Sequence, residues 1–289
     1  MQIVSKDLTF AYNKKAEFNR QALNGVNLVI EEGDFFGIIG HTGSGKSTFI
    51  QHLNGLIKTQ GGTLKVGGYD LSYGVKNKPE VLKRLRSEVG MVFQYPEYQL
   101  FAETVYEDVA FGVKNFFPSF TNEEVENAVK EALLQVGLDY NEVKNKSPFE
   151  LSGGQKRRVA IAGVLATKPQ ILVLDEPVAG LDPQGKKRLM DLILNLKNDR
   201  LKTVIIVSHD LDEVTENCNK IAVFCGGKVV MCDTPKNVFK DAKLLESYGL
   251  GLPITAKCTE NLKELGVTID SNYKAKDFIE KVVEAYKNK

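Results

Sequence analysis

The chain has 289 residues, of which 43% are apolar and 26% charged, as in globular proteins with one large domain or two smaller ones. Its 38 Lys and Arg against 37 Asp and Glu give a formal charge of +1, so the composition shows no basic footprint for nucleic acid. No run approaches the roughly 18 apolar residues of a membrane span, and the start lacks the layout of a signal peptide, so we expect a soluble protein.

The first elements are two alternating segments, Ile3 to Tyr12 and Ala22 to Glu31, which predict a β-hairpin or meander. A polar stretch over residues 13–17 separates them. Tyr12 ends the first strand, where its ring is a candidate for stacking on a base. The competing interpretation is a packed strand residue, because aromatic side chains favour strands for ordinary reasons.

A phosphate-binding loop follows the apolar run Phe35 to Ile39, which predicts a buried strand. The pattern G-x-x-x-x-G-K-S occupies residues 40–47, and a predicted helix begins at about Lys46. Its glycines let backbone N–H groups turn toward an anion, and the helix N-terminus adds unpaired amides. A chance match is disfavoured by the strand before and the helix after. The predicted nucleotide-binding residues are Gly40, His41, Thr42, Gly43, Ser44, Gly45, Lys46, Ser47 and Thr48.

Three residues of this loop have individual predicted roles. Lys46 brings a positive charge to the β- and γ-phosphates of a nucleotide, and Ser47 places its hydroxyl on Mg²⁺. Thr48 assists with the α- or β-phosphate. We assign no separate chemistry to His41 and Thr42.

The segment after this loop predicts a short hairpin at Gly61 to Gly68, a charged connection, and a strand from Val89 to Phe93 that Gln94 closes. Residues 95–101 are expected to form an irregular loop with exposed aromatic rings, because proline disfavours regular structure there. From residue 105 to about 146 the apolar spacing is helical, with a capping box at residues 121–124. We therefore predict an inserted helical subdomain over residues 95–150.

The motif Leu-Ser-Gly-Gly-Gln at residues 151–155 opens the next predicted helix. Ser152 is the expected N-cap, and Gly153 and Gly154 expose N-terminal amides to an external ligand. The run of Lys156, Arg157 and Arg158 suits either a nucleic-acid patch or a solvated helix face, and the second interpretation is favoured.

Two later strands end in chemically useful side chains. The strand Ile171 to Leu174 leads into Asp175 and Glu176, at the sheet edge where ligands bind in α/β proteins. Asp175 is the natural partner of Mg²⁺, and Glu176 is placed to orient or deprotonate a water. The strand at residues 203–207 delivers His209, a candidate contact to the γ-phosphate. The alternative is that Asp175 and Glu176 are ordinary solvated surface residues without a role in binding.

The C-terminal part predicts a hairpin of Lys220 to Phe224 and Lys228 to Met231, then a lysine-rich tail over residues 250–289. Within that tail, Lys276 to Tyr286 has the apolar spacing of a docking helix. The four cysteines have no C-x-x-C spacing, so we expect reduced thiols rather than a metal site. They are Cys218, Cys225, Cys232 and Cys258.

These motifs occur in the order and approximate spacing of ATP-binding-cassette ATPases, a resemblance that covers residues 3 to about 240. It implies an α/β fold with a P-loop NTPase core, an antiparallel β subdomain, an inserted α-helical subdomain and a small C-terminal extension. The implied domains are a nucleotide-binding domain at 1–240 and an extension at 241–289 that contacts a second subunit. Here Asp182, predicted to cap a helix with Pro183 in its first turn, would lie at the dimer seam.

A narrower resemblance lies in Phe93 to Phe101, which looks like the corresponding loop of energy-coupling factor (ECF) transporter ATPases. Those subunits energise uptake of vitamins or of metal ions such as cobalt and nickel. The implied partners are a second ATPase subunit, identical or related, a transmembrane coupling subunit and a substrate-binding membrane subunit. The implied location is peripheral, at the cytoplasmic face of the membrane, without nucleic acid. The sequence leaves the cargo open.

The resemblance also implies a mechanism in which each chain holds half of a site. Two ATP molecules would be buried in a head-to-tail dimer, with Ser152, Gly153, Gly154 and Gln155 of one chain approaching the γ-phosphate held by the other. Tyr12 would stack on adenine and His209 would hold the γ-phosphate. Glu176 would be the catalytic base. The implied Mg²⁺ contacts are Ser47, Gln94 and Asp175, with Gln94 alternatively touching the attacking water.

Two other classes of function compete with this interpretation. One is a DNA-repair or translation ATPase with the same cassette, which would usually carry a long coiled coil, a second cassette or a basic region. The other is a small-molecule kinase, which would leave the motif at residues 151–155 without a purpose.

Overall fold

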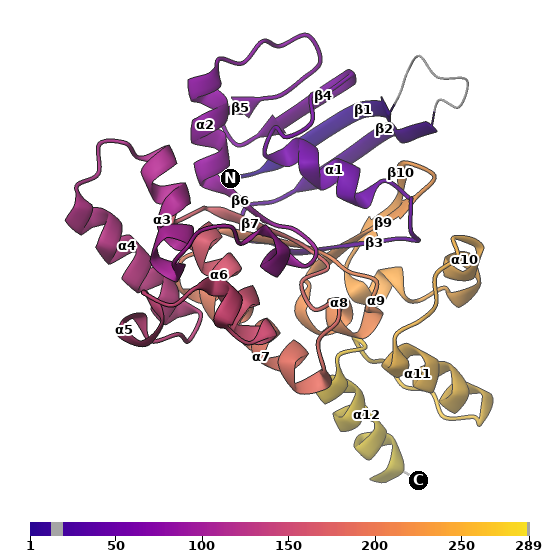
Figure 1. Cartoon of the computed structure of the whole chain (residues 1–289). Coiled ribbons are helices and arrows are strands. Elements are labelled where there is room, and N and C mark those ends of the chain that lie inside the picture. The colour runs from indigo at the N-terminus through magenta and orange to yellow at the C-terminus, as the bar shows by residue number, and fades with distance from the viewer. Residues whose placement is uncertain (13–19, 288–289) are drawn as a thin grey trace.

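The computed structural model describes residues 1–12 and 20–287, which form two sheets surrounded by helices (Figure 1). The strands are β1 (Ile3–Tyr12), β2 (Arg20–Ile30), β3 (Phe35–Ile39), β4 (Gly61–Val66), β5 (Tyr69–Asp70), β6 (Val89–Val92), β7 (Ile171–Asp175), β8 (Thr203–Val207), β9 (Lys220–Cys225) and β10 (Lys228–Asp233). The helices are α1 (Lys46–Leu53), α2 (Pro79–Glu88), α3 (Val105–Phe116), α4 (Asn122–Gln135), α5 (Tyr140–Val143), α6 (Gly153–Leu165), α7 (Pro183–Asp199), α8 (Leu211–Asn217), α9 (Pro235–Val238), α10 (Ala242–Ser247), α11 (Ile254–Glu264) and α12 (Ala275–Lys287). The predicted α/β class is confirmed.

The central sheet has six strands in the order β10-β9-β3-β8-β7-β6, all parallel to their neighbours except β10. Its strands are short and apolar because both faces are buried. On β7, Leu172 and Leu174 belong to one core cluster, while Ile171 and Val173 belong to the other. This alternation follows from the two-residue period of a strand.

Each face of the central sheet has its own cover (Figure 1). On one face, α1 and the antiparallel sheet β2-β1-β4-β5 share a core in which Phe36 and Ile38 join Phe49 and Leu53. The core on the other face joins the sheet to α3, α4, α6 and α7. The predicted hairpins of residues 3–31 and 61–68 therefore form one sheet, and it lies over the loop helix α1.

Between β6 and β7, the predicted helical insertion over residues 95–150 contains α3, α4 and α5, and α6 follows it. Thr121 and Glu124 make the predicted capping box at the start of α4. One expectation was wrong and another needs a small correction. The charged connection before β6 contains α2, which begins with Pro79 at its first position and buries only Leu85 and Ser87. The loop over residues 95–101 exposes its aromatic rings as predicted, but it also contains a short 3₁₀ turn at Pro96–Gln99.

The C-terminal helices follow the hairpin of β9 and β10. The predicted helix over residues 276–286 forms as α12, but none of its residues is buried. Ile279, Val283 and Tyr286 expose their side chains to solvent. Figure 1 shows α12 projecting from the body of the protein toward the C-terminus. Within the described ranges, no helix is both long and apolar enough to cross a membrane.

Candidate functional site

The phosphate loop links β3 to α1, and its glycines are required by close packing. A Cβ atom on Gly40 would lie 2.3 Å from the carbonyl oxygen of Phe224, and one on Gly45 would lie 2.5 Å from that of Ala22. Gly45 also has a φ of 108°, a left-handed conformation that other residues avoid. The loop is thus enclosed between strands β2 and β9.

Lys46 lies inside the curve of this loop. Its Nζ donates hydrogen bonds to the carbonyl oxygens of Gly40, at 2.7 Å, and of His41, at 3.1 Å. Burial lowers the pKa of Lys46, while the charges of Glu176 and Asp175 act in the opposite direction. The ammonium group is therefore desolvated before any nucleotide arrives, which strengthens its attraction for a phosphate.

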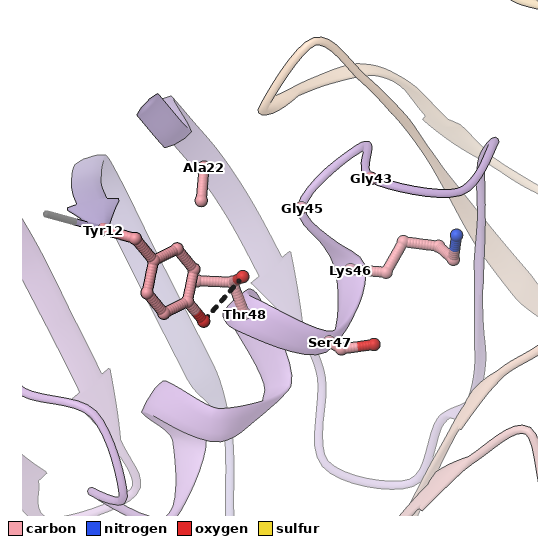
Figure 2. Close-up of a pocket in the computed structure, with 7 residues that line it drawn as sticks. All are labelled: Tyr12, Ala22, Gly43, Gly45, Lys46, Ser47 and Thr48. Carbon is pink, nitrogen blue, oxygen red and sulfur yellow. Dashed lines mark hydrogen bonds between the residues drawn. The ribbon is translucent and has the colours of Figure 1, made fainter. Parts of the chain in front are cut away.

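Beside the loop lies a surface cavity of about 210 Å³ (Figure 2). It is lined by Tyr12, Ala22, Gly43, Gly45, Lys46, Ser47 and Thr48. The hydroxyl of Tyr12 forms a hydrogen bond with Thr48 Oγ1 at 3.2 Å, and Phe10 contacts the Tyr12 ring edge-to-face at 4.8 Å. Tyr12 is nevertheless 46% exposed. A fixed, exposed ring at the mouth of a phosphate site suits the stacking of a base.

The carboxyl ends of three adjacent strands bring together Gln94, Glu176 and His209. Gln94 Nε2 donates to Glu176 Oε2 at 2.9 Å, and His209 Nδ1 lies 3.3 Å from Glu176 Oε1. Glu176 has a φ of 49°, and its N–H donates to the carbonyl oxygen of Val207. This strained turn directs one carboxylate to a position between an amide and an imidazole.

Asp175 is the residue before this cluster and the last residue of β7. Burial raises its pKa, whereas a hydrogen bond from Ser47 acts in the opposite direction. A buried carboxylate thus adjoins the loop hydroxyl that the sequence assigns to the same metal. Both groups offer the oxygen atoms that Mg²⁺ prefers.

The segment Ser152 to Gln155 forms the predicted N-terminus of α6. Ser152 and Gln155 make a reciprocal capping box, and both glycines between them are exposed. A Cβ atom on Gly153 or Gly154 would have no other atom within 4 Å. Within the described part of the chain, no hydrogen bond joins this segment to the phosphate loop. One chain therefore does not bring the two glycine-rich segments together by direct bonding.

The prediction that residues 156–158 form a solvated helix face is wrong for Arg157. Its guanidinium is buried and forms two bonds of 3.0 Å to the carboxylate of Glu97. It also donates to the carbonyl oxygens of Pro177 and Ala179. The sequence did contain a signal, because Arg157 shares helical spacing with the buried Ile161 and Leu165.

Comparisons with known proteins give a consistent result. The ABC transporter family model matches residues 23–179. The energy-coupling factor transporter ATP-binding protein EcfA2 of Clostridium tetani is 45% identical over 94% of this chain and 92% of that protein. The protein of the same name from Bacillus licheniformis is 47% identical over 93% of this chain and 91% of its own length.

Solved structures agree with the sequence relatives. CbiO1 from Clostridium perfringens, described as part of the ABC transporter complex CbiONQ, has a TM-score of 0.72 and 35% identity over 89% of this chain and 98% of that one. A dimeric, post-hydrolysis structure of the ATP-binding cassette MJ0796 with ADP and Pi has a TM-score of 0.70 and 31% identity, covering 80% and 98%. The chain therefore belongs to the ABC transporter family, as an ATP-binding subunit of the energy-coupling factor type.

Proposed function

We propose that this ATPase works as half of a head-to-tail dimer in an importer for a vitamin or a transition-metal ion. The observation that carries the hydrolytic part of the proposal is the contact of Gln94 and His209 with one carboxylate, that of Glu176. This cluster lies at the sheet edge where β3 delivers the phosphate loop. The remaining steps assign a role to each of these groups.

Glu176 acts as the general base on the water that attacks the γ-phosphate. Its carboxylate is held from both sides, and only 21% of its side chain is exposed. The hydrogen bond from Gln94 fixes the orientation of one oxygen, which leaves the carboxylate ready to accept the proton of the water. Lys46 and His209 stabilise the charge that develops on the transferred phosphoryl group.

Mg²⁺ fits the oxygen donors at the start of α1 and the end of β7. Ser47 would supply a hydroxyl, Asp175 a carboxylate and Gln94 its amide oxygen, since its nitrogen is already bonded to Glu176. When bound, the ion would neutralise charge on the β- and γ-phosphates. A cation beside Asp175 would also offset the cost of burying that carboxylate.

The second half of the active site comes from another chain. Ser152, Gly153, Gly154 and Gln155 present a helix N-terminus to solvent, and anions bind readily at such ends. Asp182, which accepts a hydrogen bond from the N–H of Gly185 and so caps α7, would lie at the same seam. The dimeric form of the related cassette MJ0796 supports pairing. The partner is either a second copy or a related ATPase.

The membrane partners of this subunit would contact the loop after Gln94. Its rings are exposed, with Tyr98 at 84% and Phe101 at 61%, and Phe101 packs edge-to-face on Phe111. The assignment of the relative CbiO1 to a transporter complex supports a transmembrane coupling subunit and a substrate-binding membrane subunit as partners. The chain would then lie peripherally at the cytoplasmic face.

The domain division follows the same proposal. The nucleotide-binding domain spans residues 1–240, with the helical subdomain over 95–150 inserted in it, and residues 241–289 form an extension that contacts the second subunit. The exposed apolar side chains of α12 support that last role. The relatives named above are transporter subunits, which disfavours the repair or translation ATPase, and a kinase would leave residues 151–155 without a role.

The test is the Glu176→Gln variant, which keeps the shape of the side chain and removes the base. ATP binding should be retained while phosphate release falls by roughly 10²-fold or more. Equilibrium binding of ATP and steady-state phosphate release measure the two quantities separately. Glu103→Gln, at an exposed position, is the control and should match the parent chain. Normal turnover by the Glu176 variant would contradict the assignment.

A further inference from the structure

The turn that carries His209 is tied to the short helix α8, which begins two residues later. The Ser208 hydroxyl is bonded to Glu213 Oε2 at 3.0 Å, and the Asp210 N–H donates to Ser208 Oγ at 3.1 Å. Asp210 caps α8 by accepting a bond from the N–H of Glu213. It also pairs with Lys186 of α7 at 2.9 Å. The direction of His209 therefore depends on the placement of α8.

The same helix also holds the two longest helices of the C-terminal extension. Asp212 Oδ1 accepts a hydrogen bond from the N–H of Ile254, the first residue of α11, at 2.7 Å. Glu216 Oε2 accepts one from the N–H of Ala275, the first residue of α12, at 3.0 Å. The first amides of a helix lack intrahelical partners, and negative charge there is stabilised by the helix dipole. The N-cap Pro253 of α11 supplies no side-chain cap of its own.

We propose that Asp212 and Glu216 are positioning residues that couple the C-terminal helices to His209. Because α12 buries none of its residues, its attachment depends on the segment at its N-terminus, where the Glu216 bond lies. A second subunit that holds the exposed side of α12 would pull on Glu216, then on α8, and then on the turn at Ser208. This inference rests on the proposed role of His209 at the γ-phosphate.

The test replaces both carboxylates by their amides, Asp212→Asn with Glu216→Gln, in the full chain with its copurified partner. We expect kcat to fall about threefold to tenfold, while the KM for ATP stays within about twofold, because the change acts on His209 and not on the phosphate loop. Amide hydrogen exchange over residues 208–217 should become faster. The matched control is Asp241→Asn, which removes the cap of α10 in the same extension without a bond to α8. Its kcat and exchange over residues 208–217 should match the parent chain.

A double-mutant cycle separates coupling from a general loss of stability. In a His209→Ala background the two amide substitutions should cause no further loss of kcat, because they act through the residue already removed. Additive losses, or unchanged exchange over residues 208–211, would overturn the proposal. The two proposals fail differently. Lack of ATP hydrolysis by the parent complex would refute the proposed function, whereas hydrogen exchange reads the α8 coupling without turnover.

Discussion

The phosphate loop and the segment Ser152 to Gln155 both offer glycines and a helix N-terminus, yet their surroundings differ. In the loop, Gly40 and Gly45 are enclosed so tightly that an added Cβ would overlap a carbonyl oxygen of another strand or turn. In the other segment, Gly153 and Gly154 have open space around them, and the Ser152 side chain bonds within its own capping box.

This difference shows that glycine is needed for a different reason in each segment. The loop glycines are explained by packing inside the chain, so their replacement must disturb the fold locally. Nothing among the described contacts explains Gly153 and Gly154. Their lack of a side chain instead suits the close approach of something outside this chain, such as a nucleotide bound by a neighbour.

The largest effect is expected at the helix that carries the second segment, α6. Arg157 lies on α6, the helix that Ser152 caps, and it connects this helix to Glu97 and to the carbonyl oxygens of Pro177 and Ala179, which follow Glu176. Glu97→Ala leaves a buried guanidinium without its counter-ion, which should lower the free energy of unfolding by about 3–5 kcal/mol. Urea unfolding measures this loss, with Glu103→Ala as the exposed control. A loss below about 1 kcal/mol would show that the ion pair does not hold α6 against the loop that contains Glu97.

The second prediction concerns the phosphate loop, where a substitution at Gly45 should distort the backbone and weaken ATP binding. Gly45→Ala combines a φ of 108° with a Cβ position 2.5 Å from the carbonyl oxygen of Ala22, so the loop must shift. We expect affinity for ATP to fall by roughly 10²-fold, the scale of a few kcal/mol that such strain costs. Gly33→Ala is the matched control, because Gly33 has a φ of 102° but open space around it. Both variants carry backbone strain, and only the first should lose ATP in a binding titration.

Local chemistry explains why so much of the fold could be predicted from the sequence. Thr121 with Glu124, and Asp182 with Pro183, start helices through bonds to residues at most three positions away. The short buried strands were equally plain, since they are continuous apolar runs. Helix α2 was missed because its burial is slight and half of its residues are charged, although Pro79 at its start was a usable signal.

The sequence could predict only those site residues that lie at the ends of strands. Gln94, Glu176 and His209 each follow an apolar run, and parallel strands place such residues at one edge. Two features depend on contacts that no local pattern contains. Arg157 is buried by a partner 60 positions away, and α8 meets the C-terminal helices through residues 42 and 59 positions apart.

A smaller, pH-dependent effect concerns Glu213, which is bonded to Ser208, the residue before His209. Burial raises its pKa from 4.5 to about 7, with Asp210 acting in the same direction, and with the Ser208 hydrogen bond, Lys186 and His209 opposing. Between these values the folded chain keeps a proton that the unfolded chain releases, so stability falls as pH rises through this window.

Glu213→Gln removes that dependence because an amide does not titrate. Relative to the parent chain, the variant should gain about 2 kcal/mol of unfolding free energy between pH 5 and pH 8, since each pKa unit corresponds to about 1.4 kcal/mol. Urea unfolding at both pH values tests this. A stability difference that stays constant with pH would mean that the carboxyl titrates normally.

The smallest change in the free energy of unfolding is expected at Gly154, where stability should rise slightly and the rate of hydrolysis should fall. Alanine is the better helix former, so Gly154→Ala near the start of α6 should raise stability slightly, by up to about 0.5 kcal/mol. ATP binding to the chain's own phosphate loop should not change. Hydrolysis should fall about tenfold, because in the proposed dimer the new methyl group would face the nucleotide of the neighbouring subunit. Gly163→Ala, in the same helix with its nearest contacts at 3.9 Å, controls for the helix propensity and should leave hydrolysis intact. Equal rates for the two variants would place residues 152–155 outside the active site, and the contrast between the two glycine-rich segments would then have no catalytic meaning.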